Sequence, residues 1–182
     1  RGSAQTTAFL NTQLFLKGYA AYGFKDRRIM GSGEVTYSFL PKAYLPREFP
    51  VSNLSLNYTT DVMSPSDKFL PTDKDNVFTS LKWTKVNHMM YFSRWTLAFD
   101  REWENNLRFK VQLRHEVDEP TAALFYQPLN GAAAPSLGGN WQKKLTTLDA
   151  TLSLTYSPGA KWVNTKQRRY APSLDFPIFS IS

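Results

Sequence analysis

Residues 107–117 read Leu107-Arg108-Phe109-Lys110-Val111-Gln112-Leu113-Arg114-His115-Glu116-Val117, and this stretch decides the fold. Its odd-numbered positions are apolar, with His115 as the exception, and its even-numbered positions carry charges or an amide. Successive side chains of a β-strand point to opposite faces of the sheet. The alternation therefore predicts a strand with one apolar face and one ionic face.

The residues before this stretch alternate in the same way and predict the strand that pairs with it. Glu104-Asn105-Asn106 lies between the two runs and suits a tight hairpin turn. If Trp103 lies opposite Leu107, the facing residues are complementary on both faces: Glu102 with Arg108, Asp100 with Lys110, Arg94 with Glu116, Phe99 with Val111, and Leu97 with Leu113. Each such pair contributes about 0.2–1 kcal/mol, and a slip of one residue would place every partner on the wrong face.

The same alternation recurs in residues 14–22, 31–39, 54–59 and 148–156. The best runs hold about nine to eleven residues, enough to cross a bilayer at a tilt, whereas strands of globular domains average about five or six. Aromatic residues also lie near the expected strand ends, as in the interfacial girdles of membrane barrels; they are Tyr22, Tyr37, Phe39, Tyr58, Trp95, Trp103, Tyr156 and Trp162. We therefore expect an all-β fold, an antiparallel up-and-down transmembrane β-barrel in which residues 1–182 form a single domain or barrel segment.

The pattern predicts about eight strands, at residues 11–23, 30–39, 52–61, 77–84, 88–103, 107–117, 145–157 and 170–181. The strand at 77–84 is needed for parity. With it, the long loop at 118–144 and the connection at 40–51 fall at one end of the sheet. The short turns fall at the other end, together with the Pro- and Asp-rich segment 62–76, a placement that the pattern does not explain; these turns are 24–29, 104–106 and 158–169.

Composition excludes several classes of protein. The chain has 182 residues and a formal net charge of +7, and it contains no cysteine, which excludes disulfides and thiolate metal sites. No apolar run approaches the ~20 residues that a membrane helix needs. The basic residues form no stripe with stacking aromatics, so we expect no nucleic-acid partner. Those at turns either lie in water or contact anionic lipid head groups; they are Lys25, Arg27, Arg28, Lys161, Lys166, Arg168 and Arg169.

The sequence contains little that indicates a catalytic site. The two histidines are His88 and His115, and neither projects to the ionic face, where a hydrolase would need Ser, His and a carboxylate to converge. Asp73-Lys74-Asp75-Asn76 resembles the start of a calcium loop but lacks the glycine and the final glutamate of an EF-hand, so we interpret it as a polar turn. The inward carboxylates each have a basic neighbour in the assumed pairing and are interpreted as a salt-bridge ladder: Glu34, Asp100 and Glu102. We expect no catalytic residue, cofactor or metal.

A family resemblance rests on turn and strand motifs in a fixed order along the chain. They are Gly18-Tyr19-Ala20-Ala21-Tyr22-Gly23-Phe24-Lys25-Asp26, Gly33-Glu34-Val35-Thr36-Tyr37-Ser38-Phe39, Tyr44-Leu45-Pro46-Arg47-Glu48-Phe49-Pro50, Tyr58-Thr59-Thr60-Asp61-Val62 and Phe176-Pro177-Ile178-Phe179. This order resembles a Bacteroidota outer-membrane family of unknown function, in which a carboxypeptidase-regulatory-like domain with an immunoglobulin-like fold precedes a β-barrel. The resemblance implies the barrel portion alone. No such sandwich precedes it here, and Ser180-Ile181-Ser182 stands where outer-membrane barrels end on an aromatic residue. We therefore expect an internal part of a larger barrel.

The predicted function is that of a bacterial outer-membrane barrel segment with a structural, transport or envelope-assembly role, and not that of an enzyme. Its partners would be outer-membrane lipid or lipopolysaccharide and other envelope proteins. The side chains expected to line the lumen are Arg94, Asp100, Glu102, Arg108, Lys110, Arg114 and Glu116. Those expected to face lipid are Trp95, Leu97, Phe99, Phe109, Val111 and Leu113.

Two alternatives remain open from the sequence. One is a soluble β-barrel or sandwich that binds a small apolar ligand inside its core. The other is an outer-membrane lipid-modifying enzyme with a Ser/His or Asp/His cluster near one rim, whose activity would depend on His88.

Overall fold

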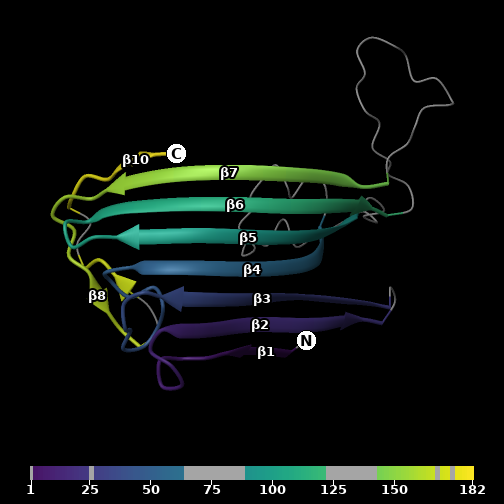
Figure 1. Cartoon of the computed structure of the whole chain (residues 1–182), viewed down its shortest axis with the longest axis horizontal. Coiled ribbons are helices and arrows are strands. Elements are labelled where there is room, and N and C mark those ends of the chain that lie inside the picture. The colour runs from purple at the N-terminus through teal and green to yellow at the C-terminus, as the bar shows by residue number, and fades with distance from the viewer. Residues whose placement is uncertain (1, 25–26, 64–88, 122–142, 167–168, 173–174) are drawn as a thin grey trace, which may run out of the picture.

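The computed structural model of this chain describes residues 2–24, 27–63, 89–121, 143–166, 169–172 and 175–182. They form one antiparallel sheet of eight strands, whose spatial order β1-β2-β3-β4-β5-β6-β7-β10 follows the chain (Figure 1). The strands are β1 (Gly2–Gln5), β2 (Leu14–Gly23), β3 (Arg28–Ser38), β4 (Ser52–Met63), β5 (Met90–Glu102), β6 (Leu107–Pro120), β7 (Leu145–Tyr156) and β10 (Phe179–Ile181). A second, two-stranded sheet pairs β8 (Val163–Asn164) with β9 (Arg169–Tyr170).

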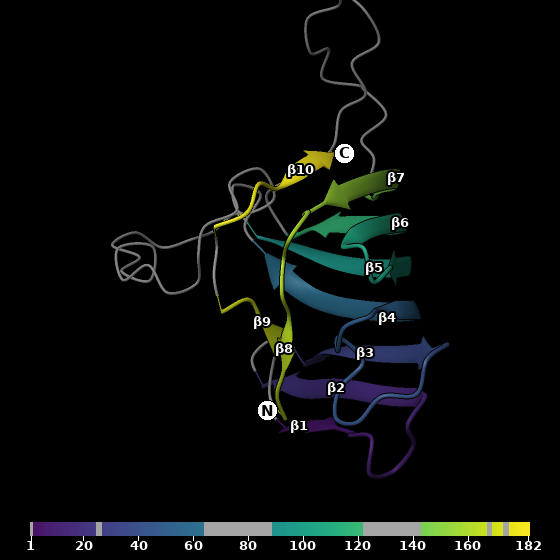
Figure 2. The ribbon, with the colours of Figure 1, turned by 90° about the vertical axis from the view of Figure 1, so that its left-hand side faces the viewer.

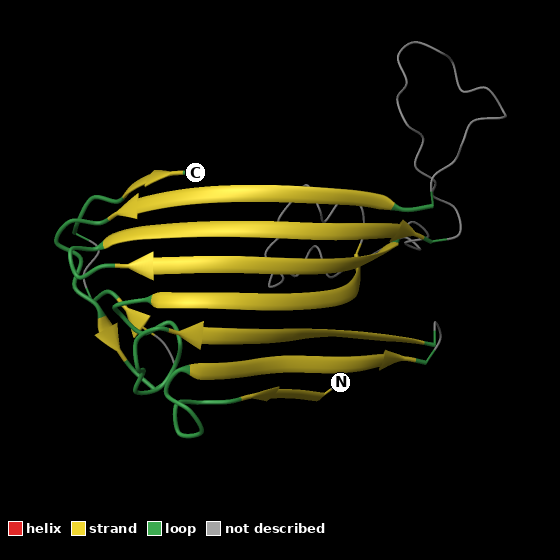
Figure 3. Ribbon diagram, viewed as in Figure 1, coloured by secondary structure: helices red, strands yellow, loops and turns green. Residues whose placement is uncertain are grey.

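The described residues contain strands, turns and loops but no helix (Figure 3). A helical membrane span is accordingly not found among them. The sheet is open, because β1 and β10 each have a neighbouring strand on one side alone. The antiparallel, all-β, up-and-down arrangement that the alternation predicts is confirmed.

The long strands follow the predicted runs closely. β2 to β7 correspond to the runs at 11–23, 30–39, 52–61, 88–103, 107–117 and 145–157. The predicted strand at 170–181 is wrong, because among its described residues only Tyr170 and Phe179–Ile181 pair. Pro172 and Pro177 lie in this run, and proline has no backbone N–H to donate to a ladder. β1 was not expected, since Gly-Ser-Ala-Gln shows no alternation.

The predicted sorting of the connections between the two ends is also wrong. β4 pairs directly with β5, from Ser52 opposite Arg101 to Met63 opposite Met90. The strand predicted at 77–84 lies outside the described residues, and counting it between these two strands shifted the parity by one. The connection at 39–51 therefore lies at the same end as the 103–106 turn and the segment after β7. β2, β4 and β6 end, and β3, β5 and β7 begin, at the opposite end of the sheet (Figure 1).

The hairpin between β5 and β6 has the predicted register. Arg94 lies opposite Glu116, Leu97 opposite Leu113, and Asp100 opposite Lys110. In the turn, the Trp103 N–H donates to the Leu107 carbonyl at 2.9 Å, and the Asn106 N–H donates to the Trp103 carbonyl at 3.0 Å. Asn106 has a φ of 62°, which asparagine tolerates better than most residues.

β2 and β3 approach each other closely at Gly31. A Cβ built there would lie 2.5 Å from the carbonyl oxygen of Tyr19 on β2. At Gly33, two residues along the same strand, an added Cβ would meet nothing within 4 Å. The two glycines lie on the same strand and differ in the space around them, so the same substitution at both positions isolates the effect of the close approach.

We predict that Gly31→Ala destabilises the sheet by about 1–3 kcal/mol, because the backbone must move apart to admit the methyl group. Gly33→Ala should be neutral or slightly stabilising, since it restricts the unfolded chain without a clash. The free energy of unfolding of both variants, from guanidinium titration followed by tryptophan fluorescence, checks this. Equal effects at the two positions would contradict the close approach.

Candidate functional site

One face of the sheet carries its apolar side chains, and this face is exposed. The odd-numbered residues of β6 point to it, together with the residues that face them on the neighbouring strands. Leu97 and Leu113 are 41% and 44% exposed, and Trp95 is 48% exposed. Phe99, Phe109 and Val111 are half-buried on the same face. The exposed apolar surface continues over the neighbouring strands through Leu14, Leu16, Val35, Tyr37, Leu54, Leu56, Leu152 and Leu154. We call this surface the apolar face.

The other face, to which the even-numbered residues of β5 and β6 point, carries buried carboxylates. Glu116 and Asp118 are 2% and 0% exposed, which makes them two of the most buried side chains in the described residues. The apolar side chains that are buried are few by comparison: Ala8, Phe15, Val51, Met90, Phe92 and Ala160. Three carboxylates of the sheet, Glu102, Glu116 and Asp118, are thus far more buried than its leucines, whereas the side chains of Arg108, Arg114 and Asp149 are 39–43% exposed. A sheet that packs an apolar core away from water would bury the leucines instead.

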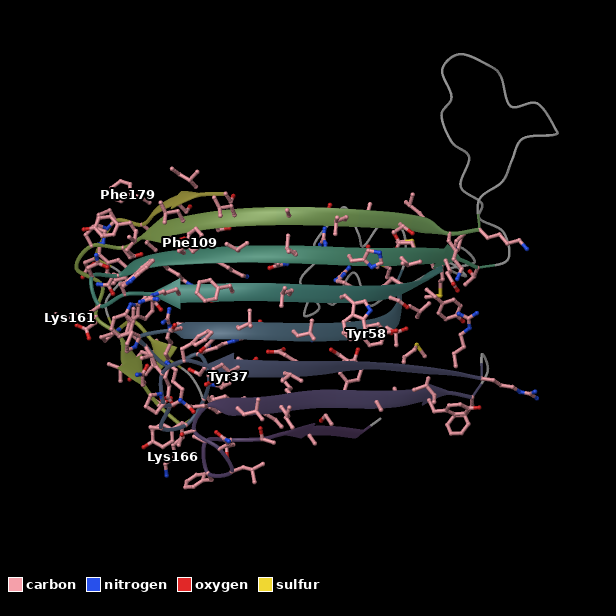
Figure 4. The ribbon with its side chains drawn as sticks, viewed as in Figure 1. Tyr37, Tyr58, Phe109, Lys161, Lys166 and Phe179 are labelled. Atoms are coloured by element: carbon pink, nitrogen blue, oxygen red, sulfur yellow. The ribbon has the colours of Figure 1, made fainter. Side chains whose placement is uncertain are left out.

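Aromatic rings gather toward both ends of the apolar face. Tyr58 packs on Trp95 with ring centroids 4.6 Å apart, and Phe39 lies 6.3 Å from Phe99. In Figure 4, Tyr37 and Phe109 lie nearer the end of the sheet that carries β8 and β9, whereas Tyr58 lies further toward the opposite end. Trp95 and Trp103 are eight positions apart on one face, about 27 Å along an extended strand.

Arginines and carboxylates pair along the even face, which we call the polar face. Arg94 on β5 bonds Glu116 on β6 through its Nε. The Nε of Arg114 donates to Asp149 Oδ2 at 2.9 Å, so β6 is also tied to β7. The seven charges that the sequence predicts for one side all lie on this face: Arg94, Asp100, Glu102, Arg108, Lys110, Arg114 and Glu116.

Two of the three predicted charge pairs face each other in register but bond elsewhere. Arg108 binds both oxygens of Asp100, the diagonal neighbour, with Nε to Oδ1 at 2.8 Å. Glu102 is taken by Arg169, a residue far along the chain that also bonds both carboxylate oxygens. The planar guanidinium fork reaches a diagonal partner and holds it with two bonds, which accounts for the difference from simple facing pairs. Asp149 and Arg169 were missed because no sequence pattern joins them to their partners.

Neutral groups complete the polar face between the ion pairs. Ser32 and Thr59 hydroxyls lie 2.9 Å apart, and the Asn57 amide donates to Ser32 Oγ at 3.1 Å. The Tyr19 hydroxyl donates to Asp61 at 3.0 Å, which links β2 to β4 across β3. Hydrogen-bonded networks of this kind lower the cost of removing polar groups from water.

Two segments cover one end of the sheet, namely residues 39–51 and residues 157–170 without 167–168. We call them the end cap, and Figure 2 shows β8 and β9 crossing that end of the strands. The Asn164 amide donates to the Phe49 carbonyl at 3.0 Å and accepts from the Phe49 N–H at 3.1 Å. The Trp162 indole N–H donates to Asn106 Oδ1 at 3.0 Å, and the Asn106 amide donates to the Ala160 carbonyl at 2.9 Å. These bonds fasten the second segment to the first and to the β5–β6 turn.

A buried lysine organises the first segment of the cap. Lys42 is 5% exposed, and its Nζ donates to the carbonyls of Glu48, at 2.8 Å, and Pro50. The Glu48 carboxylate accepts the N–H groups of Ala43, at 2.9 Å, and Leu45, at 2.7 Å. Burial lowers the pKa of Lys42, and the charge of Glu48 opposes that effect.

A cavity of about 620 Å³ lies between the cap and the polar face of β2 to β6. Its charged walls come from the sheet and from the cap: Lys17, Glu34, Arg47, Glu48, Asp100, Arg108, Lys110 and Arg169. Phe15, Leu45, Pro46, Val51 and Ala98 add apolar wall. The sequence did not predict this cavity, since it needs the folded cap.

Candidate catalytic and metal-binding residues are not brought together in the part of the chain that the structure describes. His115 is exposed on the apolar face, opposite Trp95 and away from the carboxylates. His88 and the segment Asp73-Lys74-Asp75-Asn76 lie outside the described residues. Among those that are described, no group of three or more His, Cys, Asp or Glu side chains is placed to hold a metal ion.

Neither a protein-family model, nor a curated protein, nor a solved structure matches this chain significantly. The geometry of its own residues therefore carries the functional argument.

We predict that Lys42→Met loosens the end cap and costs about 1–3 kcal/mol, because the carbonyls of Glu48 and Pro50 stay buried without a donor. Lys161→Met is the matched control, since Lys161 is exposed in the same cap (Figure 4). Proteolysis of the cap and the free energy of unfolding measure the effect. A Lys42→Met variant as stable as the control would contradict the organising role of the lysine.

Proposed function

We propose that this chain is a segment of the wall of a bacterial outer-membrane β-barrel, with a structural, transport or envelope-assembly role and no catalysis of its own. The observation that carries the proposal is the inverted burial of the two faces. Leu97 and Leu113 are more than 40% exposed, while Glu116 on the same hairpin is 2% exposed. Lipid against the apolar face and a water-accessible interior against the polar face would satisfy both sets of side chains.

Strand length supports the same proposal. β2 to β7 are 10, 11, 12, 13, 14 and 12 residues long. Tilted strands that cross a bilayer need about 9–11 residues. The rings around Trp95 and Trp103 would lie at the two lipid–water interfaces, where aromatic girdles are found. The motif resemblance to Bacteroidota outer-membrane barrels agrees with this assignment, and lipid or lipopolysaccharide and other envelope proteins would be its partners.

The open edges favour a place within a larger barrel. On β7, Leu148 and Leu152 are 74% and 60% exposed, compared with 44% for Leu113 on the neighbouring β6. β10 pairs with β7 only from Tyr156 to Leu154, so the outer edge of β7 is largely without a neighbour in the described sheet. Further strands beside β7 and β1 would pair these edges and close the wall.

The soluble alternative requires a second layer over the apolar face, because a water-soluble sheet with this much exposed leucine would aggregate. The enzyme alternative requires a histidine beside a nucleophile or a carboxylate. His115 is on the wrong face for that role, and His88, on which this alternative depends, lies outside the described residues.

The proposal predicts different costs for charges on adjacent residues of β6. Val111→Arg should cost about 2–4 kcal/mol if it lies near the bilayer midplane, since it places a charge in lipid. Gln112→Arg should cost much less, because this side chain projects to the polar face among ion pairs. Folding into lipid vesicles, followed by β-type circular dichroism and guanidinium titration, compares the two.

Failure of Val111→Arg to fold at all would favour the soluble alternative, in which a core residue has acquired an unpaired charge. Equal tolerance of both substitutions would contradict the membrane proposal and the soluble alternative together.

A further inference from the structure

The cavity beneath the end cap is of ligand size. Its volume of about 620 Å³ lies within the range of about 300–1,000 Å³ that small-molecule sites occupy. The polar face of the sheet forms its floor, and Leu45, Pro46 and Arg47 of the cap form part of its roof. Thr165 and Arg169, from the second cap segment, complete the wall.

The carboxylates that line this cavity are already engaged. Both oxygens of Glu48 accept backbone N–H groups of the cap. Both oxygens of Asp100 are held by Arg108. Glu34 accepts the hydroxyl of Thr36 at 3.2 Å. The neutral donors leave the charges of Glu48 and Glu34 in place but occupy their oxygens, whereas Asp100 is neutralised by Arg108.

Cations from separate elements are left over. Lys17 comes from β2, Lys110 from β6 and Arg47 from the cap, and all of them line the cavity. Among the described ion pairs, none joins these side chains to a carboxylate. Lining groups carry five positive charges (Lys17, Arg47, Arg108, Lys110, Arg169) and three negative ones (Glu34, Glu48, Asp100). Arg169 is paired with Glu102, which does not line the cavity, so with this fourth carboxylate included the surplus is +1.

We propose that this cavity binds a small organic anion that carries carboxylate or phosphate groups. A recess with low-dielectric walls focuses the field of its unpaired cations and concentrates anions within it. Phe15, Val51 and Ala98 offer apolar contact to a carbon skeleton, which favours an organic molecule over a bare inorganic ion. The proposal depends on the polar face and the cap and does not require the apolar face to lie in lipid.

Isothermal titration of the refolded full chain with citrate, in detergent micelles, tests the site. We expect saturable binding that weakens as salt is added. Lys110→Gln should weaken binding by about tenfold, since it removes one charge-assisted contact. Lys17→Gln, on a different strand, should do the same and serves as the second variant should the first fail to fold. Lys161→Gln is the matched control, because Lys161 is exposed and does not line the cavity.

The result that supports the site is loss of affinity in Lys110→Gln or Lys17→Gln with wild-type affinity in Lys161→Gln. No heat of binding at millimolar citrate would overturn it. Equal loss in all variants would also overturn it, since that is the signature of nonspecific attraction to a basic protein. Vesicle insertion of the same samples is measured in parallel, so failure of this site remains distinct from failure of the barrel proposal.

Discussion

Period-two alternation across one continuous antiparallel sheet is the constraint on which this structure depends. In the β5–β6 hairpin, the register that pairs Arg94 with Glu116 also pairs Leu97 with Leu113, so polar and apolar faces are fixed together. A shift of one residue would exchange them. The ladder carries this register through β2 to β7. Two separate surroundings are therefore needed, one for leucines and one for arginines and carboxylates.

The polar face is stabilised by arginine more than by simple facing pairs. Arg108 and Arg169 each bind both oxygens of one carboxylate, on Asp100 and Glu102 respectively. The second of these joins the end cap to the end of β5 and stacks Arg169 on Trp162 at 4.2 Å. Because Arg108 binds Asp100, the facing Lys110 has no carboxylate partner among the described ion pairs, and neither has Lys17. The proposed anion site therefore depends on which carboxylates the arginines bind.

Sequence reasoning succeeded where a local period governs the structure. It predicted the long strands, the Asn106 turn and the β5–β6 register, because alternation and facing charges are local facts. It failed where long-range contacts decide: the Arg169–Glu102 pair and the Lys42–Glu48 arrangement depend on loop conformation, which no period encodes. It also assigned several connections to the wrong end of the sheet, because a strand at 77–84, which lies outside the described residues, was counted between β4 and β5. The exposed fractions of Leu97 and Glu116 could not be predicted from the sequence, because they depend on what packs against each face in three dimensions.

Quenching of tryptophan fluorescence by brominated lipid tests the central claim most directly. Two variants are compared in ordinary and brominated vesicles, one keeping Trp95 alone and the other Trp162 alone, with the remaining tryptophans replaced by phenylalanine. Trp95 lies on the apolar face, whereas Trp162 hydrogen-bonds Asn106 within the end cap. The account predicts strong quenching of Trp95 and weak quenching of Trp162, since bromine quenches rings that touch acyl chains. An unquenched Trp95, in a chain that remains a stable monomer in plain buffer, would contradict it.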